Sequence, residues 1–290
     1  MKVKERLKLF AELGKVKITF AVSLTTLAGY LMARGHFDTG LILPAFGIFL
    51  LACGSSALNH FQDADRDGLM KRTRNRPIPS GRVSKKATLI FALFLVLTGS
   101  GLIWLGSDFV GFQLGLLALI WYNGIYTPMK RKTAFAVIPG SVIGAIPPVV
   151  GWVAGGGDVF SLQALMLAFF FFIWQVPHFW LLMLKYGEEY VQAGYPSITQ
   201  LYDEKHIRYL TFLWTFATAV TALMLPLFGL TRSVWVTLSI LVAVIWLIFV
   251  FSGMLKKEST VPFNPFYYFM RINYFVLVII ISLSVDPFIR

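Results

Sequence analysis

The sequence has few charged residues and a single cysteine. Only 14% of its 290 residues are Asp, Glu, Lys or Arg, whereas 57% are hydrophobic, a composition too apolar for the surface of a soluble protein of this length. The lone Cys53 excludes an intramolecular disulfide framework, a thiolate zinc site and a CxxC redox pair. Acidic residues are also scarce, and the net charge is +12. Because the basic residues lie in short clusters between apolar runs, we expect them to serve membrane orientation and lipid head groups, and not nucleic acid.

Long apolar runs take the place of the missing polar surface. A helix needs about 20 apolar residues to cross a bilayer, and the chain contains nine such runs, bounded by charges, Gly or Pro. The predicted spans are 17–33, 40–60, 88–106, 109–126, 134–154, 162–183, 209–229, 234–255 and 266–286. They lack the strict alternation of an outer-membrane barrel, so helices are expected. The predicted fold class is all-α, with the whole chain, 1–290, as one polytopic transmembrane domain.

The distribution of Lys and Arg predicts the orientation of the chain. If the N-terminus is cytoplasmic, every Lys and Arg except Arg34, Arg232 and Arg290 falls on the cytoplasmic side, which is a strong positive-inside bias. Nine spans then place the C-terminus outside. Residues 1–16 are too charged for a secretory signal and predict an amphipathic helix at the membrane surface. With no transit segment before the first span, we expect a prokaryotic plasma (inner) membrane.

Two cytoplasmic loops, 61–87 and 184–208, are long and polar, and we expect the chemistry there. Asn59, Asp63 and Asp67 lead into the first loop at intervals of four, so they share one face of a helix that continues to Gly68. Carboxylates at a helix C-terminus oppose the macrodipole at a cost of about 0.3–1 kcal/mol each, so a compensating cation is expected. Oxygen ligands suit Mg²⁺ better than zinc or copper. The competing interpretation is a solvated helix end.

Basic side chains follow the acidic stripe. Guanidinium groups beside a hard metal ion suit a diphosphate, although positive-inside topology alone explains the basic residues further along the loop. The candidates for diphosphate binding in this loop are Lys71, Arg72, Arg74 and Arg76.

Together, Asn59-x3-Asp63-x3-Asp67 and the Arg72–Gly81 stretch resemble the first aspartate-rich motif of the UbiA superfamily of intramembrane prenyltransferases. The resemblance implies a bundle of nine helices around a central cavity. It also implies that the acidic stripe holds Mg²⁺ and that the arginines grip the diphosphate of an isoprenyl donor.

A second stretch, 121–140, is similar to the same superfamily. It contains Tyr122 and Tyr126, one helical turn apart, followed by Lys130 and Arg131. The resemblance implies that Lys130 and Arg131 complete the diphosphate clamp and that Tyr126 lines the site. An aromatic belt with basic anchors is the alternative interpretation.

The third stretch, Trp-Gln-x-Pro-His-Phe-Trp in the sixth span, is similar to a motif of one branch, the protoheme IX farnesyltransferases. Gln175, His178, Lys185 and Glu189 fall within one arc of a continuous helix, and polar groups at this depth usually face a cavity. The resemblance makes Glu189 a further metal ligand, although Glu188 and Glu189 stand where that branch usually has aspartates. His178, Gln175 and Lys185 are candidates to bind the acceptor. A hydrogen-bonded packing pair of Gln175 and His178 is the alternative.

The resemblance implies Mg²⁺-dependent transfer of a farnesyl group from farnesyl diphosphate to the vinyl group of haem B, in contact with membrane lipid and with haem-pathway enzymes as partners. Two alternatives stay open. One keeps the chemistry and changes the acceptor to an aromatic or quinone precursor. The other is a transporter of anionic lipids or metabolites, in which acids and bases form a gate.

Overall fold

The structure is a computed structural model and describes residues 3–255 and 263–289. Nine helical segments in these ranges are long and apolar enough to cross a membrane, which confirms the expected number of spans and the all-α fold class. They are α2 (Val16–Arg34), α3 (Ile42–Asp67), α4 (Lys85–Gly106), α5 (Phe109–Ile120) with its continuation to Met129, α7 (Val137–Gly140) with α8 (Val142–Ala154), α9 (Leu162–Gln192), α10 (Glu204–Leu227), α11 (Val234–Ser252) and α12 (Pro265–Val285).

Three of these helices extend beyond the spans that the hydropathy suggested. α3 continues to Asp67 and α9 to Gln192, while α10 already begins at Glu204. The predicted cytoplasmic loops, 61–87 and 184–208, therefore include helical turns at both of their ends. Hydropathy marks only the apolar part of a helix, and the polar turns beyond it persist here because their side chains find partners on neighbouring segments.

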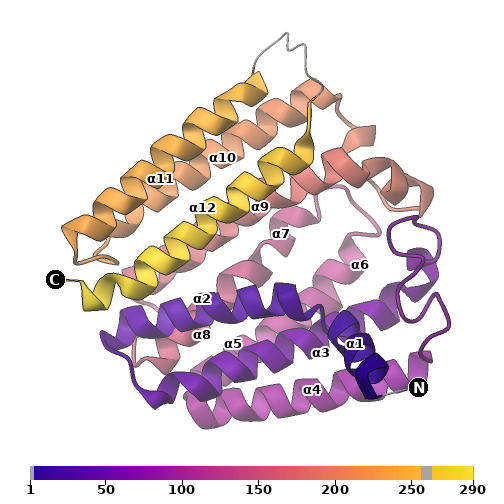
Figure 1. Cartoon of the computed structure of the whole chain (residues 1–290), viewed down its shortest axis with the longest axis horizontal. Coiled ribbons are helices and arrows are strands. Elements are labelled where there is room, and N and C mark those ends of the chain that lie inside the picture. The colour runs from indigo at the N-terminus through magenta and orange to yellow at the C-terminus, as the bar shows by residue number, and fades with distance from the viewer. Residues whose placement is uncertain (1–2, 256–262, 290) are drawn as a thin grey trace.

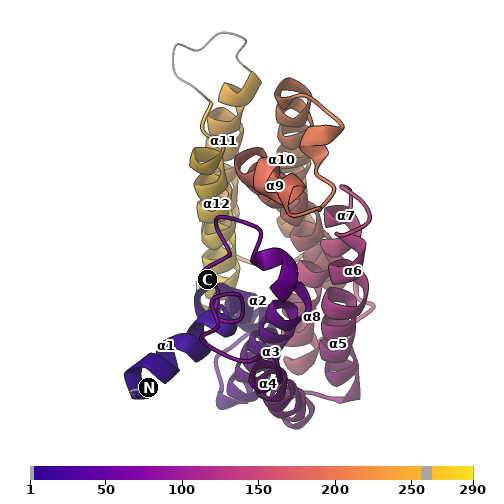
Figure 2. The ribbon, with the colours of Figure 1, turned by 90° about the vertical axis from the view of Figure 1, so that its right-hand side faces the viewer.

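The N-terminal segment forms the expected helix, α1 (Val3–Leu13), which projects from the bundle (Figure 2). Its apolar side chains have different environments, because Leu13 packs against Ala57 and Ala92 whereas Leu7 is exposed. Residues 1–2 lie outside the described ranges. So do Arg290, Lys256 and Lys257, which also entered the prediction of orientation.

The helices form two groups that meet along α2, α8 and α9. α10, α11 and α12 lie together on one side and α3 and α4 on the other (Figures 1 and 2). The largest apolar cluster joins α9 to α10, α11 and α12 through fully buried side chains such as Phe170, Phe251 and Phe275. The C-terminal ends of α3 and α9 lie at one end of the bundle, and the chain's C-terminus lies at the opposite end (Figure 1).

Glycine brings the backbones of α2 and α8 into direct contact. A Cβ atom added at Gly151 would lie 1.8 Å from the Thr26 carbonyl oxygen, and one at Gly29 would lie 1.9 Å from that of Pro148. Thr26 Oγ1 donates a hydrogen bond of 3.0 Å to the Pro147 carbonyl at the same contact. Small residues and interhelical hydrogen bonds are the usual means of helix association within lipid.

We predict that Gly151→Ala lowers the free energy of unfolding by about 1–3 kcal/mol, because the added methyl group overpacks two backbones that have no room to yield. The midpoint of thermal unfolding in detergent measures this. Gly101→Ala, also in a membrane-spanning helix, is the matched control, since a Cβ there meets nothing within 4 Å. A Gly151→Ala protein as stable as Gly101→Ala would contradict the close contact.

Candidate active site

Asp63 is the centre of a buried polar cluster near the C-terminal end of α3. Only 3% of the residue is exposed. Its Oδ2 accepts a hydrogen bond of 2.8 Å from Asn59 Nδ2 and forms an ion pair with Lys130 Nζ. Its Oδ1 accepts bonds of 3.1 Å from both Arg131 Nη2 and the Tyr195 hydroxyl. Two distant chain segments, at 130–131 and at Tyr195, thus converge on one carboxylate of α3.

The partners of Asp63 are themselves shielded from water. Burial lowers the pKa of Lys130 below its ordinary value, against the opposing field of Asp63. Burial also raises the pKa of Tyr195, with the negative charge of Asp63 adding to the rise. Tyr195 therefore stays a protonated hydrogen-bond donor at neutral pH. Removing both Lys130 and Arg131 would leave the buried Asp63 carboxylate without a counter-ion, and breaking a buried ion pair in this way typically costs about 3–5 kcal/mol.

Asp67 lies one turn further along α3 and binds a different cation. Arg76 Nη1 donates to both of its carboxylate oxygens, at 2.7 and 2.8 Å. The Thr73 hydroxyl donates to the Asp67 carbonyl at 2.8 Å. The loop after Gly68 is thereby folded back over the end of the helix, and Arg76 lies where the sequence suggested a phosphate-binding group.

Glu189 contacts this loop rather than the Asp63 cluster. Its Oε2 accepts a hydrogen bond of 2.8 Å from the backbone N–H of Arg72, and the Arg72 guanidinium lies over the Tyr186 ring, 4.9 Å from its centroid. Nearby, Arg66 Nη1 donates to the Gly194 carbonyl at 3.0 Å. These contacts join the end of α9 and the segment after it to the end of α3 and its loop.

The other two basic candidates of the loop stand apart. Lys71 and Arg74 are exposed, and within the described ranges neither forms an ion pair. Of the basic candidates in 71–76, only Arg76 reaches an acidic residue of α3 through its side chain.

The donors on α3 fit a hard cation such as Mg²⁺. Asn59, Asp63 and Asp67 share one buried face and offer oxygen atoms only. Asn59 donates its amide hydrogens to Asp63 and to the Thr127 hydroxyl, which leaves its Oδ1 as an acceptor. Among the described residues, no three His, Cys, Asp or Glu side chains gather as a metal cluster, and the carboxylates bind cationic side chains. The same cations fit the diphosphate that would accompany the metal.

An aromatic cavity lies beside this cluster. It has a volume of about 180 Å³ and is lined by Tyr122, Tyr126, Val137, Gly140, Ile143, Gln175 and Phe179. The rings of Tyr122 and Tyr126 stack at 5.7 Å with an interplanar angle of 14°. Lys130 Nζ lies 5.8 Å from the Tyr126 ring centroid, so the cavity adjoins the Asp63 cluster.

A π-helical turn, η2 (Trp121–Tyr126), shapes the wall of this cavity. Asn123 within it accepts a hydrogen bond of 2.6 Å from the Ser55 hydroxyl and donates one of 3.0 Å to Gln62 Oε1, both on α3. The extra residue of a π turn shifts the helical register, and such turns are frequent at functional sites. The sequence alone gave no sign of it.

The acceptor candidates on α9 point to two places. Gln175 lines the aromatic cavity, whereas His178 packs between the rings of Trp174 and Phe269, with centroids 5.0 and 4.7 Å away. Lys185 Nζ lies 4.0 Å from the Phe266 ring centroid. No hydrogen bond links Gln175 to His178 in the part of the chain that is described, so the two side chains do not form the hydrogen-bonded pair that was the alternative interpretation, although His178 is packed against aromatic rings.

Lys15 is a site residue that the sequence analysis missed. It occupies the left-handed backbone region with φ of 47° between α1 and α2, which is uncommon for a residue other than glycine. Burial lowers its pKa to about 7, and the positive charges of Arg76 and Lys130 add to this, whereas Asp67 and Asp63 oppose it. Lys15 thus belongs to the same electrostatic cluster. Its only sequence signal was a lysine before an apolar span.

The comparisons with known proteins agree with this geometry. Residues 22–275 match the model of the UbiA prenyltransferase family, and the chain belongs to that family. It is 34% identical over 281 residues to a protoheme IX farnesyltransferase of Oleidesulfovibrio alaskensis, covering 97% of this chain and 96% of that one. It is 36% identical over 250 residues to one of Nitratidesulfovibrio vulgaris, covering 86% of each.

Solved structures share the fold at low sequence identity. A structure concerned with digeranylgeranylglyceryl phosphate synthase matches with a TM-score of 0.77 and 17% identity, over 98% of this chain and 99% of that one. A UbiA homolog from Archaeoglobus fulgidus bound to DMAPP and Mg²⁺ matches with a TM-score of 0.70 and 14% identity, over 95% and 99%. The arrangement of nine helices is therefore the fold of these intramembrane proteins.

We predict that Lys15 makes diphosphate binding depend on pH. Below a pH of about 7 the side chain gains a proton and its positive charge favours an anion, so donor affinity rises as the pH falls through this value and weakens above it. The Kd for a non-hydrolysable isoprenyl diphosphate analogue, measured from pH 6 to 8.5, checks this.

Lys15→Arg is the matched control, because a guanidinium stays charged throughout this range. The Kd of the variant should change with pH only as far as the ligand itself titrates, and the part of the pH dependence that comes from Lys15 should be absent. Identical profiles for the wild-type and Lys15→Arg proteins would show that Lys15 does not face the anion.

Proposed function

We propose that this chain transfers a farnesyl group from farnesyl diphosphate to a vinyl group of haem B, giving haem O, with Mg²⁺ as cofactor. The observation that carries the proposal is the buried Asp63 cluster, in which oxygen donors and cations meet beside an aromatic cavity. Relatives named protoheme IX farnesyltransferase match nearly the whole chain, and a structural neighbour was solved with an isoprenyl diphosphate and Mg²⁺.

The donor would bind at the end of α3. Asn59, Asp63 and Asp67 would hold Mg²⁺, which supplies positive charge to the departing diphosphate. Lys130, Arg131 and Arg76, now paired with the carboxylates, would turn to phosphate oxygens. We assign Glu189 to the same metal site as a further ligand, reached when the loop it contacts rearranges around the donor. Mg²⁺ would then pair with the carboxylates and the diphosphate with the three basic side chains, so each charge that enters the site meets a charge of opposite sign already held there.

The transfer step balances without a redox partner. The allylic C–O bond of the donor breaks, and its electron pair leaves with the diphosphate. The π electrons of the haem vinyl group form the new C–C bond to the farnesyl carbon, and water captures the resulting cation and loses a proton. The products are a hydroxyethylfarnesyl haem, diphosphate and H⁺. Ionisation of the donor is the step that the clustered cations would favour.

The aromatic cavity suits the carbon skeleton of the donor. The stacked faces of Tyr122 and Tyr126 offer cation–π stabilisation to an allylic cation, and the apolar lining excludes water before transfer. Gln175 brings a polar group into the same cavity, where it would orient the acceptor.

His178 and Lys185 would contact the haem from α9. His178 Nδ1 is buried and has no hydrogen-bond partner within the described residues, so this nitrogen is free to contact the haem. Lys185 is exposed near the same end of the bundle and would pair with a propionate. This arrangement requires the α3 and α9 ends to face the cytoplasm of a prokaryotic plasma membrane, with the C-terminus outside, as the basic residues suggest.

We predict that Asp63→Asn or Asp67→Asn lowers kcat by about 10²–10³-fold, because a preorganised charge at the developing diphosphate is lost. Steady-state assays with farnesyl diphosphate, haem B and Mg²⁺ measure the change. Asp65→Asn is the matched control on the same helix, since the Asp65 side chain is 86% exposed and pairs only with Lys85. Full activity of the Asp63 and Asp67 variants would place the metal elsewhere.

We predict that the product formed from haem B, farnesyl diphosphate and Mg²⁺ has the mass of haem O. His178→Ala should weaken haem turnover while leaving donor affinity unchanged, because His178 lies apart from the Asp63 cluster. Product mass spectrometry and a donor-binding assay check the two parts. If the protein prenylates an aromatic acid and not haem, the proposed acceptor is wrong. If intact donor crosses vesicle membranes without turnover, the protein is a transporter and not a transferase.

A further inference from the structure

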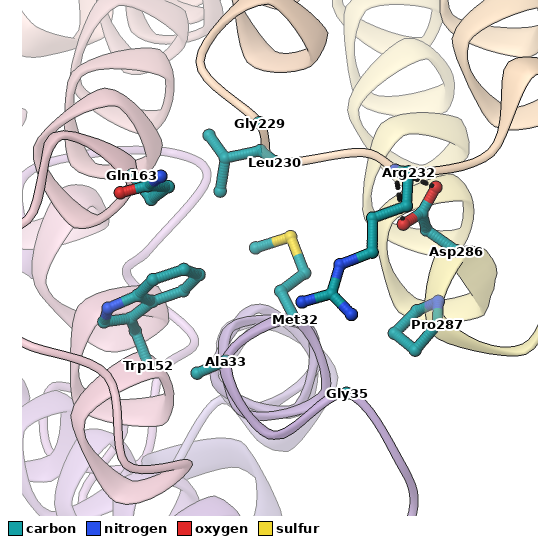
Figure 3. Close-up of a pocket in the computed structure, with 10 residues that line it drawn as sticks. All are labelled: Met32, Ala33, Gly35, Trp152, Gln163, Gly229, Leu230, Arg232, Asp286 and Pro287. Atoms are coloured by element: carbon teal, nitrogen blue, oxygen red, sulfur yellow. Dashed lines mark hydrogen bonds between the residues drawn. The ribbon is translucent and has the colours of Figure 1, made fainter.

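A second cavity lies at the opposite end of the bundle from the Asp63 cluster. Its volume is about 300 Å³, and its walls come from α2, α8, α9, the α10–α11 connection and the end of α12 (Figure 3). It therefore lies where the two groups of helices meet. Nothing in the proposed reaction uses it.

One wall of the cavity carries an exposed arginine, Arg232, whose guanidinium has no counter-ion among the described residues. The Arg232 side chain extends into it, past Met32 (Figure 3), and forms no ion pair among the described residues. The neighbouring arginine at this end, Arg34, is bound to Asp38 at 2.8 Å. A guanidinium favours the planar oxygens of phosphate and carboxylate.

Asp286 lines the same cavity but does not neutralise Arg232. Its carboxylate accepts three backbone hydrogen bonds of 2.9–3.0 Å, two from the Arg232 N–H and one from that of Ser233. Figure 3 shows its oxygens turned toward the Arg232 backbone and away from the guanidinium. Asp286 thus fixes the chain on which Arg232 is carried and leaves the side chain's charge available.

The remaining walls suit an amphiphile. Trp152, Met32 and Leu230 provide apolar surface, and Gln163 adds an amide close to Gly229. Its Nε2 would lie 3.8 Å from a Cβ at Gly229, and no hydrogen bond ties it to another described residue. Trp and Arg at the ends of membrane-spanning helices occupy the depth of lipid head groups.

We propose that this cavity binds the head group of an anionic phospholipid, with Arg232 and Gln163 on the phosphate and Trp152 and Met32 against the glycerol and first acyl carbons. A lipid seated there contacts the end of α2 and the segment that follows α12. Free phosphate esters share the head-group chemistry, and the experiment separates the two sources.

Native mass spectrometry of the purified protein with equal phosphatidylglycerol and phosphatidylcholine tests the proposal. We expect the wild-type protein to retain phosphatidylglycerol preferentially, Arg232→Gln to bind it about tenfold more weakly, as loss of a charged hydrogen bond implies, and Gln163→Leu to bind it two- to fivefold more weakly. Arg34→Gln is the matched control at the same end, because Arg34 already has a partner.

Folding is checked separately by the unfolding midpoint in lipid-free detergent, which should be the same for the Arg232→Gln and wild-type proteins, and Arg232→Lys should restore part of the preference. Unchanged lipid retention in Arg232→Gln, or equal loss in Arg34→Gln, would overturn the proposal. Displacement of the lipid by millimolar glycerol phosphate would also overturn it, since the site would then recognise phosphate regardless of the tail. Farnesyl transfer is a separate readout, so either proposal can fail alone.

Discussion

The structure depends on neutralising a carboxylate inside an apolar bundle. An uncompensated charge there costs several kcal/mol, and Asp63 is 3% exposed. Lys130 and Arg131, which follow the π turn in the chain, form ion pairs with Asp63, and Tyr195, which follows α9, donates a hydrogen bond to it. Because these partners come from separate segments, the one carboxylate fixes how the ends of the helices close. The folded loop after α3, tied through Asp67 and Arg76, completes the same enclosure.

In the proposed function, this arrangement also lowers the free-energy cost of reorganising the site when a highly charged donor binds. The basic side chains are already desolvated and held in place by carboxylates. In the proposed function, the metal takes their place at the carboxylates and the diphosphate takes the place of the carboxylates at the basic side chains. Preorganised charge avoids the reorganisation that water would require during bond breaking. In the proposed function, the residues that stabilise this end of the bundle are also those that bind the donor, so strengthening the present ion pairs of Asp63 would oppose binding of the donor.

The sequence predicted the features that lipid and periodicity impose. Nine spans follow from hydropathy because only hydrogen-bonded helices satisfy the backbone in lipid, and the Asn59, Asp63 and Asp67 stripe follows from the helical repeat. Contacts that depend on loop paths could not be predicted this way. The spacing placed Glu189 on the same face of α9 as Gln175 and His178. In the structure, however, the Glu189 carboxylate accepts a hydrogen bond from the backbone N–H of Arg72 in the loop after α3. Lys15 reaches the site only through a left-handed turn at a residue that rarely adopts one.

The two ends of the bundle handle charge in opposite ways. At the α3 end each buried carboxylate is held by cationic side chains, so an anion must displace an acid to reach them. At the other end Asp286 is satisfied by backbone N–H groups, and no acidic side chain among the described residues pairs with the Arg232 guanidinium. An anion binding there displaces no ion pair and needs no metal. The two proposed anion sites thus use the same residue types, and they differ in whether side chains or backbone N–H groups neutralise the neighbouring carboxylate.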